Sequence, residues 1–383
     1  MDRDLQPSLV HEAYIEDHRT DGLRSGEGCV AALPDGSLYM VYGRFEGTSD
    51  HAKATLVERR STDGGLHWSK AVVLRETPAG ALNLMSVSLL PLDDGRLACV
   101  YLRKNALSDC RPCFMTSGDG ARTWSEPRYA LDKPGYYVVN NDRLVQLNSG
   151  RLLIPYTAYG PEPRFNLAEG VYCGCALSDD RGATWRRGTG EIRIEPANVR
   201  LPLLADEARP DSASPVNNDQ IQCQEPGVVE LADGRIMMWC RSRGGYAYRV
   251  YSADGGETWS PFEAIADFAM PNGPQSIKRL PGSARLVMLY NDRRGVPFGH
   301  PQFQWRRPLA MAVSDDGGLS WRRLGLLEPE TVPTTCYYSI CFHADNVVFT
   351  YYEGVMMVRD NLYVPRNLAS LKLKIVKRSY FEL

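Results

Sequence analysis

Five residues of this chain have side chains suited to proton transfer or anion binding and stand beside apolar stretches. Glu225 and Tyr338 each precede an apolar segment, and Asp50 lies in a short polar segment. Carboxylates act as general acids and bases, and a tyrosine can attack an electrophilic carbon once a base takes its proton. Arg241 and Arg306 supply planar guanidinium groups, which bind carboxylates through paired hydrogen bonds. The elements that position these residues decide whether they form one site.

An eight-residue turn motif recurs five times and divides the chain into similar units. Its form is S-x-D-x-[GA]-x-x-W, and the copies occupy residues 61–68, 117–124, 178–185, 252–259 and 314–321. Asp and Gly suit a tight turn that needs a positive φ, and the closing Trp is a large apolar anchor. Five copies of so specific a pattern indicate a repeat protein.

A second repeat, a strand–turn–strand pattern, precedes each turn motif and occurs a sixth time near the end. The six hairpins occupy residues 28–42, 85–101, 141–156, 225–240, 275–290 and 338–352. Six units of about four strands each predict an all-β protein, a six-bladed β-propeller in one domain covering residues 1–383. The blades are expected near residues 24–70, 83–126, 138–187, 222–261, 273–323 and 335–383. An alternating tail at 371–376 and an N-terminal strand at 11–15 are expected to close the sixth blade.

Composition narrows the classes of partner and location. The net charge of -2 provides no basic field for nucleic acid, and no apolar run reaches the ~20 residues of a membrane span. The N-terminus has no secretory apolar region, which favours a cytoplasmic location. The ten cysteines are expected to be mostly reduced and buried, including the isolated Cys110-Arg-Pro-Cys113. No motif indicates a cofactor or a metal site.

The turn motifs on a six-unit β pattern resemble the sialidase (neuraminidase) superfamily over nearly the whole chain. In that family the motifs lie on outer turns, and the activity belongs to the first residues of the inner strands, at the propeller axis. The resemblance implies a retaining exo-glycosidase that releases a terminal sialic acid or a related acidic sugar. A neutral tyrosine is the nucleophile there, since a carboxylate would be repelled by the substrate's own carboxylate.

The catalytic roles transfer to three residues through their motifs. Tyr338 in Cys336-Tyr-Tyr-Ser339 resembles the nucleophile, and Tyr337 is the alternative if the register differs by one. Glu225 resembles the partner that activates the tyrosine. Asp50 resembles the loop residue that serves as acid and base.

Arginines that resemble the family's carboxylate ligands follow two of the hairpins. Arg241 matches the second of the family's three arginines, with Arg243 as an alternative. Arg306 matches the third, and its neighbour Arg307 is expected to point the opposite way in a strand. Arg44 resembles a further substrate-contacting arginine.

The first inner strand departs from the family pattern. The family opens this strand with Arg-Ile-Pro, where the chain has Gly26-Glu-Gly28, so Glu27 stands in place of a carboxylate-binding cation. Arg24 could supply that charge. The third hairpin adds polar residues at its head, which are expected to contact substrate: Asn141, Asp142 and Arg143. Two alternatives therefore remain open: a glycosidase of a different sugar, and a propeller that binds glycans without catalysis.

Overall fold

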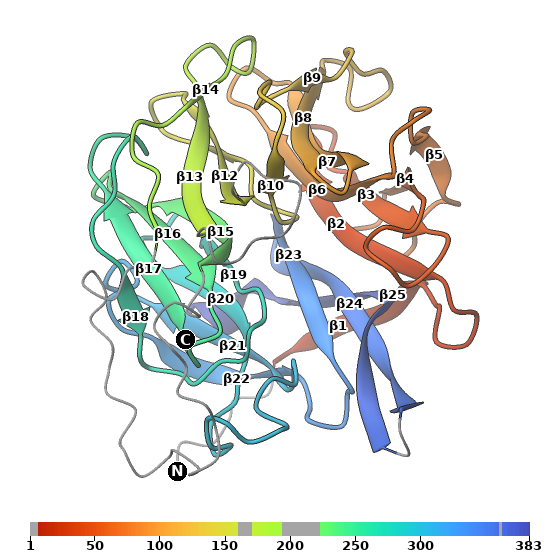
Figure 1. The fold of residues 1–383 in the computed structure, drawn as a ribbon, viewed down its shortest axis with the longest axis vertical. Coiled ribbons are helices and arrows are strands. Elements are labelled where there is room, and N and C mark those ends of the chain that lie inside the picture. Colours follow the sequence, from red (N-terminus) through yellow and green to blue (C-terminus); the bar gives the residue numbers. More distant parts are fainter. Residues whose placement is uncertain (1–6, 160–170, 194–222, 360–361) are drawn as a thin grey trace.

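The computed structural model describes residues 7–159, 171–193, 223–359 and 362–383 of the chain. Antiparallel sheets follow one another around a common centre, and the first and last sheets lie side by side (Figure 1). The all-β propeller expected from the repeats is confirmed. The N-terminal half contributes three groups of strands: β2 (Arg24–Ala32), β3 (Leu38–Phe45), β4 (Ala54–Ser61) and β5 (Val72–Arg75); β6 (Asn83–Pro91), β7 (Leu97–Ala106), β8 (Asp109–Ser117) and β9 (Arg128–Tyr129); β11 (Val145–Gln146), β12 (Leu152–Tyr159), β13 (Val171–Ser178) and β14 (Arg186–Arg187).

A short extra strand, β10 (Tyr136–Val138), joins the second and third groups into one nine-stranded sheet, because it pairs with both β8 and β12. The C-terminal half contributes the remaining three groups and ends in a short 3-10 helix at Arg378–Phe381: β15 (Gln224–Glu230), β16 (Ile236–Arg241), β17 (Ala247–Ser252) and β18 (Glu263–Ile265); β19 (Ser276–Arg279), β20 (Leu286–Asn291), β21 (Leu309–Ser314) and β22 (Arg322–Glu328); β23 (Thr335–His343), β24 (Asn346–Arg359) and β25 (Leu362–Lys377) with β1 (Leu9–Glu16).

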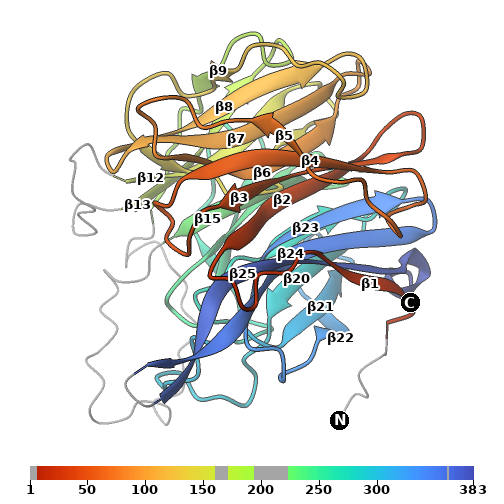
Figure 2. The same cartoon turned by 90° about the vertical axis from the view of Figure 1, so that its right-hand side faces the viewer.

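Strands from the two ends of the chain share the last sheet, which closes the ring. Strand β1 pairs along the outer edge of β25, with Ala13 opposite Leu373, as Figure 2 shows from the side. The expected pairing of residues 11–15 with the tail at 371–376 is confirmed. Side chains of β1 and β25 also meet the first sheet, where Ile15, Leu371 and Leu373 pack with Met40 and Val57.

A buried ion cluster reinforces this closure. Lys372 Nζ lies 2.7 Å from Glu12 Oε1, 2.8 Å from Glu328 Oε1 and 2.7 Å from Glu353 Oε2. Glu328 is 2% exposed and Glu353 is 7% exposed. Lys372 therefore pairs with carboxylates from β1, β22 and β24, and Lys374 Nζ adds a second cation 2.9 Å from Glu328 Oε2.

Replacing Lys372 by Met is expected to lower the free energy of unfolding by about 3–5 kcal/mol, because it leaves the buried Glu353 without the cation that it has among the described residues. Urea denaturation followed by fluorescence measures the change. Lys377→Met, at the end of the same strand, is the matched control and should change stability by less than about 0.5 kcal/mol. An equal effect of the two substitutions would show that the cluster does not stabilise the closure.

The turn motifs owe their sequence to one hydrogen-bond pattern. In the first copy, Ser61 Oγ accepts the Gly65 N–H at 2.9 Å, and Asp63 Oδ1 accepts the His67 N–H at 3.0 Å. The same serine-to-backbone bond is present in the other four copies. In the one variant copy, Ala121 adopts the positive φ (62°) that glycine adopts in the other four, so the turn is kept although alanine replaces glycine.

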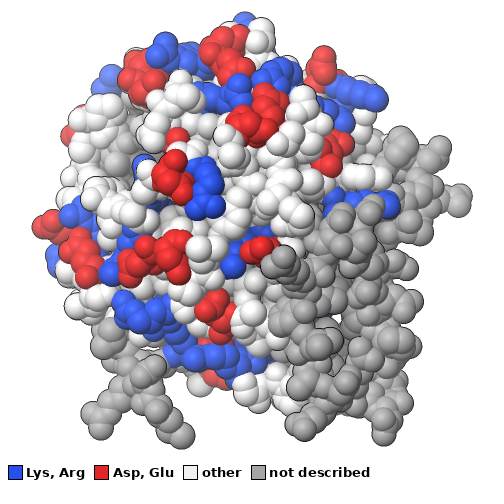
Figure 3. Space-filling view, turned by 90° about the vertical axis from the view of Figure 1, so that its left-hand side faces the viewer, with Lys and Arg blue, Asp and Glu red and all other residues white. Residues whose placement is uncertain are grey.

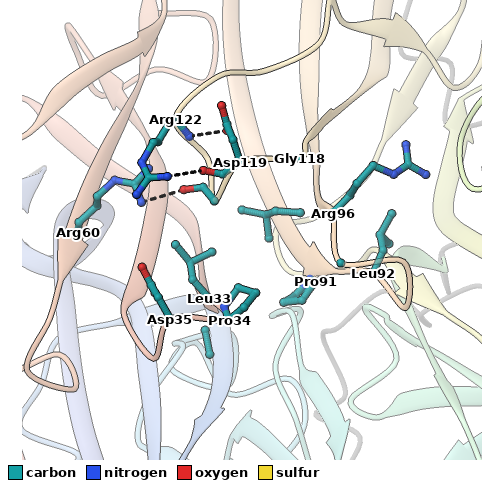
Figure 4. A pocket seen from close by; sticks show the side chains of 14 residues that line it. Leu33, Pro34, Asp35, Arg60, Pro91, Leu92, Arg96, Gly118, Asp119 and Arg122 are labelled. Carbon is teal, nitrogen blue, oxygen red and sulfur yellow. Dashed lines mark hydrogen bonds between the residues drawn. The ribbon is translucent and has the colours of Figure 1, made fainter.

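Arginines of one sheet hold the turn motif of the next. Arg60 of β4 donates to the carbonyls of Gly120 and Ala121, and Figure 4 shows it beside Asp119. The same region contains a pocket of about 300 Å³. Its walls include the hairpin turns at 33–36 and 91–96, which lie at the ends of the strands remote from residues 24–28 and 83–86.

Among the cysteines, eight are free and buried, as expected, whereas Cys223 and Cys240 form a disulfide between the heads of β15 and β16. In the described part of the chain, no helix is long and apolar enough to cross a membrane. No three His, Cys, Asp or Glu side chains of the described residues gather in a way that could hold a metal ion. Acidic and basic side chains are interspersed on the face seen in Figure 3.

Candidate active site

The innermost strands of four sheets begin with the same backbone irregularity. A β-bulge interrupts the pairing of β2, β6, β15 and β23, and each bulge contains one non-glycine residue with positive φ. These residues are Glu27 (52°), Ser86 (57°), Glu225 (48°) and Tyr337 (59°). Such backbone conformations cost about 1–3 kcal/mol each and concentrate at functional sites. A bulge also redirects its side chain, and here all four redirected side chains are polar.

Tyr337 and Glu225 meet at the centre of this arrangement. The Tyr337 hydroxyl donates to Glu225 Oε1 at 3.1 Å, although the residues are 112 positions apart. Arg241 Nη2 lies 3.2 Å from the same carboxylate oxygen. Burial, together with the charge of Glu225, raises the pKa of Tyr337 well above its ordinary value. The tyrosine is therefore neutral until a base removes its proton, and Glu225 is in position to do so.

The structure corrects the position expected for the tyrosine. Tyr338 points into the core, is 1% exposed and packs with Leu289, Ile340 and Phe349. Its hydroxyl donates to Asn291 Oδ1 at 2.8 Å and to the carbonyl of Thr335 at 3.0 Å. Tyr338 therefore does not fit the role of nucleophile, and the alternative, Tyr337, occupies that place. The physical reason is the bulge between Cys336 and Ser339, which shifts the alternation of side chains by one residue.

Arg306 completes the group around Tyr337. Its guanidinium carbon lies 5.9 Å from the Tyr337 ring centroid, and Nε and Nη2 donate to the carbonyl of Asn272. In the described part of the chain Arg306 forms no salt bridge to a carboxylate. Its neighbour Arg307 points away, with Nε 3.4 Å from Glu330 Oε1. Only one of the two adjacent arginines therefore faces Tyr337, as expected, although both precede β21 and lie outside the strands.

A second group of charges lies next to the first. Arg24 Nη2 donates to Glu27 Oε1 at 2.9 Å, and Arg24 Nη1 donates to Asp50 Oδ1 at 2.5 Å. Ser86 Oγ donates to Glu27 Oε2 at 2.6 Å. Burial raises the pKa of Glu27 against the opposing effect of Arg24. Asp50 and Glu27 thus share one guanidinium group, and Glu27 does not stand free in the site.

The polar residues at the start of the third hairpin hold neighbouring strands together near the propeller axis. Asn141 Nδ2 donates to the carbonyls of Gly28 (2.8 Å) and Tyr337 (3.2 Å), so Asn141 supports the backbone at two of the bulges. Asp142 Oδ1 accepts from Lys278 Nζ at 2.6 Å, and Asp142 Oδ2 accepts the N–H of Ile340 at 2.9 Å.

Arg143 and Asp142 were expected to contact substrate, and the structure places both elsewhere. Arg143 is 2% exposed and donates to the carbonyl of Gln275 at 2.6 Å and to Ser276 Oγ at 3.2 Å. Burial lowers the pKa of Arg143 to about 10. Both side chains connect the third group of strands to the fifth and sixth groups.

Arg44 also lies outside the group. Its guanidinium pairs with Glu16 of β1 at 2.5 Å, and Arg59 pairs with the same carboxylate at 2.9 Å. This ion pair joins the first sheet to the closing strand. The expectation that Arg44 contacts substrate finds no support in its position.

Several buried polar atoms at the site have no hydrogen-bond partner among the described residues. They include Glu225 Oε2, Arg241 Nε, Arg241 Nη1 and Asn141 Oδ1. Buried polar atoms are normally paired, with protein or with water. Their convergence around Tyr337 marks this end of the axis as a place for a polar ligand.

Residues 100–351 match the BNR repeat-like domain. The chain belongs to this family. A sialidase of Micromonospora viridifaciens is 29% identical over 335 residues, which cover 78% of this chain and 45% of that protein. The chain thus spans less than half the length of this relative.

Two solved structures share the fold of this BNR repeat-like protein. One, from Dyadobacter fermentans, is described as of unknown function; its TM-score is 0.69 at 16% identity, covering 96% of this chain and 99% of that one. The other is the Trypanosoma rangeli sialidase in complex with sialic acid, with a TM-score of 0.67 at 14% identity, covering 98% of this chain and 60% of that one. The fold is therefore that of a sialidase-type propeller.

The sequence did not single out two aromatic residues that border the site of this BNR repeat-like protein. Tyr136 of β10 and Tyr159 of β12 are paired across the sheet, with ring centroids 5.9 Å apart. Burial, helped by the charge of Glu225, raises the pKa of Tyr159 to about 12 against the lowering effect of Arg241. No motif identifies these tyrosines, because β10 is an addition to the repeat.

Proposed function

We propose that this chain is a retaining exo-glycosidase of sialidase type that acts on a terminal acidic sugar. The hydrogen bond from the Tyr337 hydroxyl to Glu225 carries the proposal, because it joins a buried neutral nucleophile to its base. The family relationship and the sialidase-type fold support it. A chain that only bound glycans would need neither a tyrosine–carboxylate pair nor strained backbone at both residues.

In the proposed reaction, Asp50 protonates the leaving glycosidic oxygen while the Tyr337 oxygen attacks the anomeric carbon. Glu225 accepts the tyrosine proton, and a covalent tyrosyl glycoside forms as the glycosidic bond breaks. Asp50, now a carboxylate, then takes a proton from water, and that water attacks the anomeric carbon and releases Tyr337, which takes its proton back from Glu225. Two displacements at one carbon give overall retention of configuration.

The arginines indicate the charge of the sugar. Arg241 has two unpartnered nitrogens among the described residues, and Arg306 faces Tyr337 without a carboxylate of its own. Two guanidinium groups on one side of the nucleophile suit a single carboxylate on the reacting ring. A 2-keto acid glycoside such as a sialoside carries its carboxylate on the reacting carbon and is therefore the proposed substrate.

Turnover of a fluorogenic aryl sialoside by the purified protein tests the proposal, with ¹H NMR of the first-formed sugar to determine its anomeric configuration. We expect release of the α-anomer from an α-sialoside before mutarotation. Release of the opposite anomer would contradict a covalent intermediate on Tyr337. Saturable binding of sialic acid with no turnover would instead identify a glycan-binding propeller.

A second candidate, a glycosidase of a different sugar, is favoured by one observation. Glu27 lies where the family has a carboxylate-binding arginine, and its carboxyl is compensated only by Arg24, which Asp50 also uses. A panel of aryl glycosides with neutral, uronic and ketosidic acid sugars discriminates between the two candidates. Turnover of a neutral glycoside above that of the sialoside would favour the second.

A further inference from the structure

Arg24 combines complete burial with a full set of protein partners. Its side chain is 0% exposed, and its guanidinium carbon stacks 3.9 Å from the centroid of the Phe45 ring. Arg24 Nε donates to the Tyr352 hydroxyl at 2.9 Å, Nη2 donates to Glu27, and Nη1 donates to Asp50. All three guanidinium nitrogens are therefore engaged by the protein, and none is presented to a sugar.

Asp50, unlike Arg24, has an exposed side chain. Its side chain is 59% exposed, although its backbone is held firmly: the Asp50 carbonyl accepts from Lys104 Nζ at 2.7 Å and from Asn83 Nδ2 at 2.9 Å. A carboxyl group exposed at the rim of the site and anchored from behind is in position to meet the glycosidic oxygen. Among the described residues, the side-chain contact that fixes its orientation is the bond from Arg24.

We propose that Arg24 is a positioning residue that acts through Asp50 in the acid–base step and is not a ligand of the sugar. The proposal rests on the function proposed above for Asp50 and goes beyond it. It also narrows the substrate: the carboxylate of the sugar is held by two guanidinium groups, Arg241 and Arg306, and not by three.

The groups that face Asp50 determine its pKa and hence the pH dependence of the proposed reaction. Arg24 and Glu27 approach from β2, Lys104 from β7, Tyr136 from β10, and His51 from the same loop. Although the Asp50 side chain reaches solvent, the surrounding protein partly desolvates its carboxyl and favours the protonated form. Arg24 and then Lys104 and His51 outweigh this effect and hold the pKa of Asp50 below its ordinary value. A general acid must carry its proton at the start of the reaction, so activity falls as pH rises through this depressed pKa.

Arg24→Met is expected to move the alkaline limb of kcat/KM upward by about one pH unit or more, because a neighbouring arginine lowers an Asp pKa by roughly 1–3 units. Since this variant leaves the buried Glu27 without a cation, the double variant Arg24→Met/Glu27→Gln removes both charges and should show the same shift. Arg59→Met, in the same sheet and paired with Glu16, is the matched control and should leave the limb in place.

Two readouts separate the possible failures. An unmoved limb, combined with a rise in KM of tenfold or more in both Arg24 variants, would overturn the proposal and make Arg24 a sugar ligand. NMR titration of ¹³C-aspartate-labelled protein, with Asp50→Asn to assign the resonance, measures the Asp50 pKa without turnover. If no glycoside is hydrolysed, the proposed function fails, whereas an Asp50 pKa equal in wild type and the double variant overturns the positioning role.

Discussion

Tyr337→Phe is expected to reduce kcat for an aryl sialoside by at least about a thousandfold, because it removes the attacking oxygen and leaves the ring in place. The affinity for the sugar should change little, since Arg241 and Arg306 remain. Single-turnover kinetics and binding of free sialic acid by calorimetry measure the two effects separately. No covalent intermediate should accumulate in this variant when a fluorinated sialoside is used as a mechanism-based inhibitor.

Tyr338→Phe provides the matched control, one residue along the same strand. The Tyr338 hydroxyl donates to Asn291 and to the Thr335 carbonyl within the core, so its loss should cost about 1 kcal/mol of stability. The kcat of Tyr338→Phe should stay within about threefold of wild type, because the hydroxyl that it loses lies in the core and does not contact Glu225. A loss of turnover confined to Tyr338→Phe would reverse the assignment made from the bulge.

Glu225→Gln is expected to lower kcat by about 10²–10⁴-fold with a much smaller change in KM. The amide has the shape of the carboxylate and can still accept the Tyr337 hydrogen bond, but it cannot take the proton. It also removes the negative charge beside Arg241, so affinity for an anionic sugar should stay equal or rise. Initial rates over a range of substrate concentrations separate kcat from KM.

Glu230→Gln, at the other end of β15, is the control for the loss of one carboxylate from the same strand. Glu230 accepts the backbone N–H of Asn148 on the far side of the sheet and has no contact with the site. Glu230→Gln should leave kcat unchanged. Equal activity of Glu225→Gln and wild type would show that Tyr337 uses another base or is not the nucleophile.

The fold was open to prediction because its determinants are local. Each turn motif makes its own hydrogen bonds within eight residues, from Ser61 to the Gly65 N–H and from Asp63 to the His67 N–H. Five local copies reveal the repeat, and alternation within the hairpins reveals the strands. The closure by β1 and β25 was also predictable, because the sixth unit lacked an outer strand.

The candidate site was predictable in part. Glu225 and Arg241 were each expected at the site, and they meet in an ion pair because Arg241, at the end of β16, lies opposite Gln224 at the start of β15. Arg306 also faces Tyr337. Asp142 and Arg143 look like site residues in sequence because they are polar and precede a strand. Their contacts lie across the axis, with Lys278 and Gln275, and no local pattern shows them.

A regular spacing does identify the bulges once it is counted. Glu27, Ser86, Glu225 and Tyr337 each lie nine residues before the third residue of the following turn, namely Gly36, Gly95, Gly234 and Asn346. The same count applied to the sixth hairpin selects Tyr337 over Tyr338. The sequence therefore does indicate which of the two tyrosines lies at the bulge, but only when the spacing is compared between the repeated units.

The sequence by itself determined the number and order of the repeats, the strands and the turn motifs, and it marked Glu225 and Arg241 as candidates in the fourth hairpin. These depend on residues close together in the chain. The tertiary structure decided which tyrosine meets Glu225, that Arg24 serves Asp50 and Glu27, and that the third hairpin head braces the axis. Those outcomes depend on bulges that redirect single side chains and on contacts that a local pattern does not show, such as Tyr337 with Glu225, 112 positions apart, and Arg24 with Asp50, 26 positions apart.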